Sequence, residues 1–464
     1  MRVSEAALVA AQLSPAMARE RAILHAPMVS TILRLAAPNA LIVLVQAAVV
    51  VSETVFVGTL GRDALAANAV VFPFLVLMQT MSAGAMGGGV SSAVARALGA
   101  GDVERARAVA LHAIIIGLAF GLFFTVLMRA LGPAIYRTLG AQGRVLELAL
   151  AYSDLLFAGI ALLWMQNTLV SLVRGTGNMK LPTAIMLASS LLQITLGYVL
   201  TIGVGPLHSI GISGIAVSLL VASAVGSLVT LALLMAPGAR VRLTVSSMRP
   251  HPALFRDILR VGGVAIFFSL QNAFAVMVMS GLVAGFGAAT VAGYGIGARL
   301  EMLQIPIAFG FGAALVPMVG MNVGAGQIER ARRVALIGSL LAGAASGVIG
   351  LVFAVAPALW SGLYTADAAV QAATATYLTR VGPTLGAFGF GICLYFATQG
   401  SGRVLGPVLA ASGRLALVGL GAWAVVAAGW GYDWLSWMAA GAMVAYGLAA
   451  FAVLRFSHWR RPGG

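Results

Sequence analysis

Hydrophobic runs separated by short polar segments recur along the whole chain. Each run has about 20 apolar residues, the number that a helix needs to cross roughly 30 Å of hydrocarbon. The pattern therefore predicts an all-α integral membrane protein with 12 transmembrane helices. The predicted spans are 35–58, 68–94, 109–131, 146–172, 181–203, 210–235, 259–285, 291–319, 334–356, 369–398, 405–428 and 434–455.

The second half of the chain repeats short blocks of the first half. The shift between equivalent positions is 226 near the start of each half and 225 after one gap. Several blocks in the same order are not expected by chance, so the sequence contains an internal duplication. The matching blocks are 32–34 (ILR) with 258–260 (ILR), 99–107 (GAGDVERAR) with 324–332 (GAGQIERAR), and 174–177 (RGTG) with 399–402 (QGSG).

The number of spans between equivalent positions determines the expected symmetry. Six spans separate a position from its repeat, so both halves begin on the same face of the membrane. They should form two six-helix lobes related by a pseudo-twofold axis along the membrane normal, an architecture typical of transporters that work by alternating access. Because the sequence has no Gly-x-x-x-x-Gly-Lys-[Ser/Thr] loop, an ion gradient is the expected energy source.

A polar stretch between the sixth and seventh spans separates the two halves and is the longest loop. We take it as the linker between the lobes. The predicted segments are a cytoplasmic N-terminal tail (1–30), an N-lobe (31–236), a cytoplasmic linker (237–257), a C-lobe (258–455) and a cytoplasmic C-terminal tail (456–464).

Composition and charge support a membrane location. Hydrophobic residues make up 61% of the chain and charged residues 9%, compared with about 25% charged residues in soluble domains. With a cytoplasmic N-terminus, 21 of the 28 Lys and Arg residues fall on the cytoplasmic side and 4 on the other. This distribution predicts an inner (cytoplasmic) membrane protein with both termini in the cytoplasm. The net charge of +15 would then face anionic lipid, and no nucleic-acid partner is expected.

Three of the 13 acidic residues lie inside predicted spans rather than at span ends, in loops or in tails: Glu53, Asp154 and Glu301. An ionised carboxylate in hydrocarbon is costly, so Glu53 must face water, be paired or be protonated. A proton carrier has these properties, and the equivalent position in the second half is Met279. The alternative for Glu53 is a carboxylate that reaches the membrane interface. Glu301 follows Arg299 by two positions and so points from a different helix face; it is a second cation-coupling candidate or a structural hydrogen-bonded acid.

Other side chains within the spans are candidates for contact with a substrate. Met offers adaptable contact surface, and amides can line a cleft or form interhelical hydrogen bonds. Pro38 frees a backbone carbonyl in the first span and can act as a hinge. We predict no catalytic residue, metal ligand or organic cofactor. The substrate-binding candidates are Gln46, Phe72, Met78, Trp164, Asn167, Gln271, Asn272 and Tyr294.

Four groups of residues together resemble the multidrug and toxic compound extrusion (MATE) family. They are Pro38 with 53–58 (ETVFVG), 174–178 (RGTGN), 292–301 (AGYGIGARLE) and 317–326 (PMVGMNVGAG). The resemblance implies a twelve-helix antiporter in which entry of H+ or Na+ drives export of amphipathic, often cationic compounds. We expect a monomer whose partners are such small molecules and membrane lipids.

The resemblance to the family's cation sites is incomplete. The first-helix acid, usually Asp in the family, is Glu53 here, and the Asn and Asp of the fifth helix correspond to Gln193 and Gly197. Acidic positions of another branch correspond to Asn272 and to Phe390 or a neighbour of Phe390, so the resemblance implies that the C-lobe cation site is missing. A hard metal cation needs several oxygen ligands, whereas one carboxylate can carry a proton. We therefore expect H+ coupling through Glu53.

Other functions remain open at this stage. Na+ coupling is possible if Glu301, Gln271 and Asn272 converge. A lipid-linked saccharide flippase of the same superfamily would need Arg or Lys in its central cavity, and the candidates are Arg299 and Arg380. A membrane enzyme would need clustered His, Asp or Glu on adjacent spans, and a non-transporting scaffold would leave the intramembrane carboxylate without a role.

Overall fold

The computed structural model describes residues 14–204, 208–243, 250–457 and 459, and the described chain is almost entirely helical. Within it, eleven helical segments are long and apolar enough to span a membrane, and a pair bent by 45° at Gly159 makes a twelfth. This confirms the predicted all-α membrane fold. Residues 1–13 of the predicted N-terminal tail, 244–249 of the linker, and 458 and 460–464 of the C-terminal tail lie outside the described residues.

The first half begins with a short helix and continues with the predicted spans. Its elements are α2 (Pro15–His25), α3 (Met28–Thr59), α4 (Arg62–Gln79), the π-helical η1 (Thr80–Met86), α5 (Gly87–Gly99), α6 (Val103–Thr138), α7 (Gly143–Ala158), α8 (Ile160–Gly175), α9 (Lys180–Ile202) and α10 (Ser213–Met235). Helix α2 was not predicted from the sequence and lies within the segment that we took as a tail.

The second half repeats this order. Its elements are α11 (Pro252–Val283), η3 (Ala284–Phe286), α12 (Ala288–Gly324), α13 (Ile328–Val355), α14 (Ala358–Ser361), α15 (Ala368–Val381), η4 (Gly382–Thr384), α16 (Leu385–Gly400), α17 (Leu405–Ala427) and α18 (Tyr432–Phe456).

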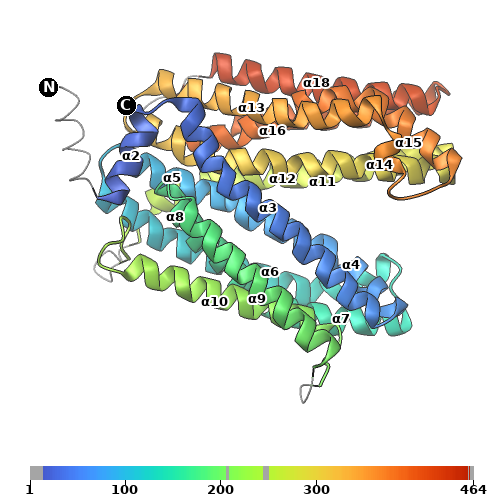
Figure 1. Cartoon of the computed structure of the whole chain (residues 1–464), viewed down its shortest axis with the longest axis horizontal. Coiled ribbons are helices and arrows are strands. Elements are labelled where there is room, and N and C mark those ends of the chain that lie inside the picture. The colour runs from blue at the N-terminus through green and yellow to red at the C-terminus, as the bar shows by residue number, and fades with distance from the viewer. Residues whose placement is uncertain (1–13, 205–207, 244–249, 458, 460–464) are drawn as a thin grey trace.

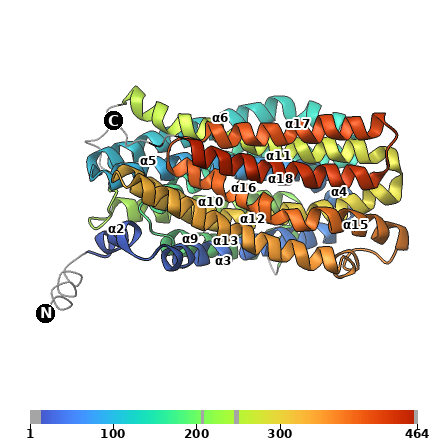
Figure 2. The same ribbon diagram turned by 90° about the horizontal axis from the view of Figure 1, so that it is seen from above.

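The two halves form two bundles arranged as a V (Figure 1). They converge at the end that carries α2 and the start of α3, and they diverge toward the end that carries α4 and α7 on one side and α14 and α15 on the other. Figure 2 shows that most helices run along the long axis of the molecule. At the converging end, α5 packs against α11, α12 and α16, and α3 packs against α12.

Close approach at the converging end depends on small residues. Gly99 of α5 and Gly324 of α12 are equivalent positions of the repeat. A Cβ on Gly99 would lie 2.1 Å from the Met321 carbonyl oxygen, and one on Gly324 would lie 2.1 Å from the Arg96 carbonyl oxygen. Only glycine allows the backbones to meet this closely, as is typical of helix contacts in membranes.

Helix α2 connects the two lobes at the same end. Its Glu20 carboxylate accepts hydrogen bonds from Arg240 Nε and Nη2 at 2.6 and 2.8 Å. Its Ile23 carbonyl accepts from Asn322 Nδ2 at 3.5 Å and from Arg330 Nη2 at 3.4 Å. Arg240 follows α10 of the N-lobe, whereas the other two donors belong to α12 and α13 of the C-lobe.

Candidate functional site

The N-lobe buries the carboxylate of Glu53 between α3 and α9. Glu53 is 8% exposed, and its Oε1 accepts a hydrogen bond from Gln193 Nε2 at 2.7 Å. Within the described chain, no Arg, Lys or His forms an ion pair with Glu53. The site, which we call the N-lobe site, is therefore a buried acid with a neutral donor. Such a carboxylate is stable only when it is protonated or reached by water.

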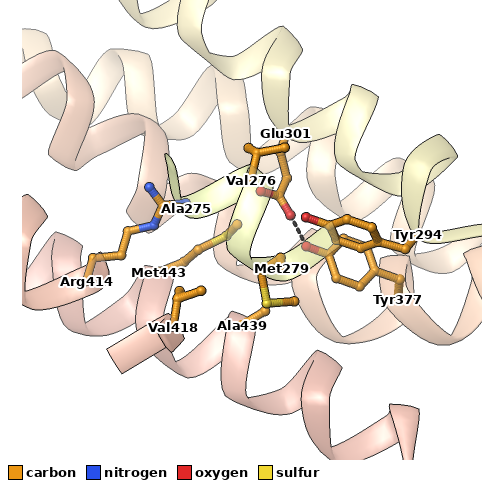
Figure 3. A pocket seen from close by; sticks show the side chains of 10 residues that line it. All are labelled: Ala275, Val276, Met279, Tyr294, Glu301, Tyr377, Arg414, Val418, Ala439 and Met443. Atoms are coloured by element: carbon orange, nitrogen blue, oxygen red, sulfur yellow. Dashed lines mark hydrogen bonds between the residues drawn. The ribbon is translucent and has the colours of Figure 1, made fainter. Parts of the chain in front are cut away.

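The C-lobe contains a pocket around Glu301 of α12 (Figure 3). The hydroxyl of Tyr377, on α15, donates a hydrogen bond to Glu301 Oε1. Tyr294 lies beside Tyr377, and Arg414 of α17 lies on the other side of the carboxylate (Figure 3). Met279 and other apolar side chains line the rest of the pocket. This C-lobe pocket therefore combines one acid, one cation and two phenols with an apolar lining.

Arg414 is fixed by contacts of its own. Its Nη1 donates to Asn272 Oδ1 at 3.0 Å, and its guanidinium carbon lies 4.5 Å from the centre of the Phe388 ring. The neighbouring amide, Gln271, donates to Ser412 Oγ at 2.5 Å. Both α11 amides are thus engaged by α17. The convergence of Gln271 and Asn272 on Glu301, which a Na+ site would require, does not occur in the structure.

The N-lobe site and the C-lobe pocket occupy equivalent places in the duplicated fold. The repeat shifts of 226 and 225 relate the residues of the first to residues in or beside the second. The equivalent pairs are Glu53 and Met279, and Gln193 and Val418; the same shift relates Tyr377 to Tyr152, a buried residue of α7. The C-lobe therefore has apolar side chains where the N-lobe has its acid and amide, and its own acid comes from a different helix.

The cations that the flippase alternative singled out lie elsewhere. Arg299 is exposed and its guanidinium carbon lies 5.0 Å from the centre of the Tyr364 ring. It points away from buried Glu301, as the spacing predicts. Arg380 forms an ion pair with Asp433. Neither arginine lines the C-lobe pocket.

The substrate-binding candidates of the N-lobe are dispersed. Trp164 is fully buried and stacks on Phe120 and Phe124 at ring-centre distances of 5.2 and 5.5 Å. Met78 is also buried in the lobe core, and Phe72 is half-buried. These side chains pack within the lobe rather than converging on one surface.

The amide candidates of the N-lobe bond to serines of neighbouring helices. Gln46 Nε2 donates to Ser190 Oγ at 3.2 Å, and Asn167 Nδ2 donates to Ser82 Oγ at 2.8 Å. Of the eight predicted substrate contacts, only Tyr294 lines the C-lobe pocket. The proposed hinge, Pro38, lies inside the uninterrupted helix α3.

Three buried arginines were not identified as interior residues from the sequence. Arg96 and Arg174 were counted among the cytoplasmic cations, and Arg414 was placed in or at the edge of a span without a role, yet each is less than 10% exposed. Arg96 Nη2 binds Asp257 Oδ1 at 2.7 Å. The duplication could have drawn attention to Arg174, because this residue opens one of the repeated blocks and differs from its equivalent, Gln399.

Comparison with known proteins identifies the family. The MatE family model matches residues 38–199 and 265–422, one range in each half and more than half of the chain in total. The chain belongs to the MatE family. It is therefore a multi-pass membrane transporter, as the resemblance implied.

Two curated relatives and one solved structure illustrate the range of the family. The chain is 27% identical over 319 residues to an FAD transporter of Shewanella oneidensis, covering 68% of this chain and 70% of the relative. It is 27% identical over 269 residues to the multidrug export protein MepA of Staphylococcus saprophyticus, covering 58% of each chain. A MOP superfamily transporter from Pyrococcus furiosus has 24% identity, a TM-score of 0.83, and coverage of 94% of this chain and 96% of that chain. The last comparison shows the common fold.

Proposed function

We propose that this MatE protein is a proton-coupled antiporter that exports amphipathic small molecules by alternating access, with Glu53 as the proton site. The burial of Glu53 beside a neutral amide carries the proposal. Burial without a cation disfavours the ionised form, whereas access to water favours it. A change of access can therefore load and release a proton at this residue.

The surroundings of both buried acids favour H+ over Na+. Gln193 directs its Nε2 donor, rather than its oxygen, toward Glu53. Glu301 accepts from Tyr377 and faces Arg414, whose positive charge opposes a second cation. A hard metal cation requires several oxygen ligands, and the described side chains around these carboxylates offer donors instead.

The relatives support export of organic compounds of more than one kind. One is named as an FAD transporter and another as a multidrug export protein. We propose amphipathic compounds, cationic ones included, as substrates of a monomer in the inner (cytoplasmic) membrane. The bacterial relatives and the Lys and Arg distribution support this location with both termini in the cytoplasm.

Transport in proteoliposomes tests the proposal. The full-length protein is reconstituted, and movement of a fluorescent organic cation is measured under a pH gradient in Na+-free buffer and under a Na+ gradient at constant pH. We expect export under the pH gradient alone. Export that requires Na+ at constant pH would overturn the proton assignment, and absence of movement under either gradient would contradict the transport proposal itself.

A further inference from the structure

A second chamber lies between the lobes at the converging end. Elements η1, α5 and α8 of the N-lobe form one side, and α12 and α16 of the C-lobe form the other. We call it the axial chamber, because a shift of 225 relates residues across it. The equivalent lining pairs are Gly84 and Phe309, Gly88 and Ala313, Ser91 and Val316, and Ser171 and Phe396.

The two sides of the axial chamber differ in chemistry. In each equivalent pair the N-lobe contributes glycine or serine, and the C-lobe contributes a larger apolar side chain. The rings of Phe309 and Phe396 pack edge to face at 5.5 Å. The chamber therefore has a small, polar side and an aromatic side, although it lies on a pseudo-symmetry axis.

Arg174 adds a buried positive charge to the polar side. It is 6% exposed, and its guanidinium carbon lies 5.7 Å from the centre of the Phe309 ring. Its Nε and the nearby Ser91 Oγ have no hydrogen-bond partner among residues 14–204, 208–243, 250–457 and 459. The two other buried arginines make side-chain hydrogen bonds through their Nη atoms, to Asp257 and Asn272, although Arg414 Nε also has no partner in the described chain.

A buried cation and hydroxyl without partners are costly. The charge is also not compensated locally, because no carboxylate of the described chain forms an ion pair with Arg174. A partner that supplies negative charge and acceptor oxygens would satisfy both groups and compensate the charge. A planar guanidinium with several donors fits carboxylate and phosphate groups.

We propose that the axial chamber binds an acidic group, phosphate or carboxylate, of an amphipathic compound. This inference rests on the proposed export function and narrows its substrate class. Arg174 and Ser91 hold the acidic group, and the adjoining ring or chain lies against Phe309 and Phe396. In this structure the chamber has an accessible volume of about 10 Å³, about the room for one water molecule, so the acidic group enters it when the lobes move apart at the converging end.

Riboflavin and flavin mononucleotide form a suitable probe pair, because they share a fluorescent ring system and differ by one phosphate. Binding to the purified full-length protein is measured by fluorescence titration. We expect the wild type to bind flavin mononucleotide at least about tenfold more tightly than riboflavin, the effect of a charge-assisted hydrogen-bond pair. Equal affinity for the two flavins in the wild type would overturn the proposal without any variant.

Substitutions of Arg174 test whether the preference for flavin mononucleotide over riboflavin arises in the axial chamber. Arg174→Gln should abolish the preference for the phosphate by weakening flavin mononucleotide binding much more than riboflavin binding, whereas Arg174→Lys should retain part of the preference because the charge remains. Arg299→Gln is the matched control, since Arg299 also lies over an aromatic ring but is exposed. Retention of the full preference in Arg174→Gln would contradict the assignment.

Thermal unfolding separates ligand binding from a structural role. Removal of an unpaired buried charge should leave the unfolding midpoint of Arg174→Gln equal to or above that of the wild type. Flavin mononucleotide should raise the midpoint of the wild type and not that of Arg174→Gln. A variant midpoint far below wild type, with no effect of the ligand on either protein, would indicate a structural arginine and overturn the proposal.

Two further measurements identify the source of the acidic group. Competition by excess inorganic phosphate supports a site for a soluble compound, whereas competition by nanodiscs of phosphatidylglycerol, and not of phosphatidylcholine, supports a site for an anionic lipid headgroup. Loss of competition in Arg174→Gln is expected in either case. Because binding is measured in detergent without a gradient, failure of pH-driven transport would reject the proposed export function and leave the binding result intact.

Discussion

The N-lobe site and the C-lobe pocket show how two copies of one fold came to differ in chemistry. Both bury a carboxylate in the same region of the repeat. In the N-lobe the acid is Glu53 of α3, whose donor is the neutral Gln193. In the C-lobe the acid is Glu301 of α12, which is bonded to Tyr377 and faces Arg414.

The different surroundings of the two carboxylates suit them to different roles, proton binding for Glu53 and helix packing for Glu301. Glu301 accepts a hydrogen bond from Tyr377 and shares its pocket with Arg414, so it is suited to hold α12 and α15 together. A carboxylate without a cation must change its protonation state when its access to water changes. The comparison therefore supports our proposal that the proton binds at the N-lobe site rather than in the C-lobe pocket.

Substitution of Glu53 should produce the largest effect. Glu53→Gln keeps the size of the side chain but cannot exchange a proton, so pH-driven efflux in proteoliposomes should fall to the background of protein-free liposomes. The amount of folded protein and its unfolding midpoint should remain close to wild type. Wild-type efflux by Glu53→Gln under a pH gradient would disprove the proton role.

Glu53→Asp provides the matched control. It retains a titratable carboxylate at the position where the resemblance implies aspartate, but it is one methylene shorter and weakens the bond to Gln193. We expect efflux that is slower than wild type and still driven by the pH gradient. Loss of all activity in Glu53→Asp would indicate that the side-chain length, rather than the proton, is essential.

Hydrophobic patterning predicted the fold well because membrane thickness sets helix length. The predicted span 181–203 corresponds to α9 (Lys180–Ile202), and 369–398 corresponds to α15–α16 within 368–400. The pattern could not show the 45° bend at Gly159 inside the predicted span 146–172. Apolar runs determine which residues lie in the membrane but carry little information about breaks within a span.

The candidate site was only partly predictable. Glu53 and Glu301 were identified because carboxylates are rare in apolar spans, and both are buried. Their partners come from other helices, so Tyr377 and Arg414 required the tertiary structure. The substrate candidates stay a prediction, and the sequence does not reveal which helix face points inward: Trp164, for example, fills the N-lobe core.

Removal of the C-lobe cation should be the next largest perturbation. Arg414→Met removes the cation of the C-lobe pocket together with its hydrogen bond to Asn272, and a hydrogen bond to a charged group contributes about 1.5–3 kcal/mol. We expect a correspondingly lower free energy of unfolding, measured by chemical denaturation in detergent. An unchanged unfolding free energy would show that Arg414 does not compensate Glu301.

The double variant Glu301→Gln/Arg414→Met sharpens this test. It removes both charges together, so most of the lost stability should return. Protein that folds should still export under a pH gradient, because Glu53 is intact. Loss of pH-driven export by a stable double variant would place part of the coupling in the C-lobe.

Gln193→Leu should have a smaller effect on transport than Glu53→Gln. It removes the donor at 2.7 Å from Glu53 Oε1 while keeping similar volume. A hydrogen bond to a charged group contributes about 1.5–3 kcal/mol, so pH-driven efflux should fall by roughly tenfold rather than disappear. Unaltered efflux across the pH range would indicate that Gln193 does not influence the ionisation of Glu53.

Tyr377→Phe is the C-lobe counterpart and should have the smallest effect. The variant keeps the ring that packs edge to face on Tyr294 at 5.2 Å and removes only the hydroxyl that donates to Glu301. Because Arg414 still compensates the carboxylate, we expect a loss of about 1 kcal/mol in unfolding free energy and wild-type efflux under a pH gradient. The comparison with Gln193→Leu is decisive. Each variant removes the hydrogen-bond donor of one buried carboxylate, and we expect Gln193→Leu to slow transport and Tyr377→Phe to lower stability. If Tyr377→Phe instead slows efflux without changing stability, the C-lobe carboxylate also takes part in coupling, and the two lobes are functionally equivalent despite their different chemistry.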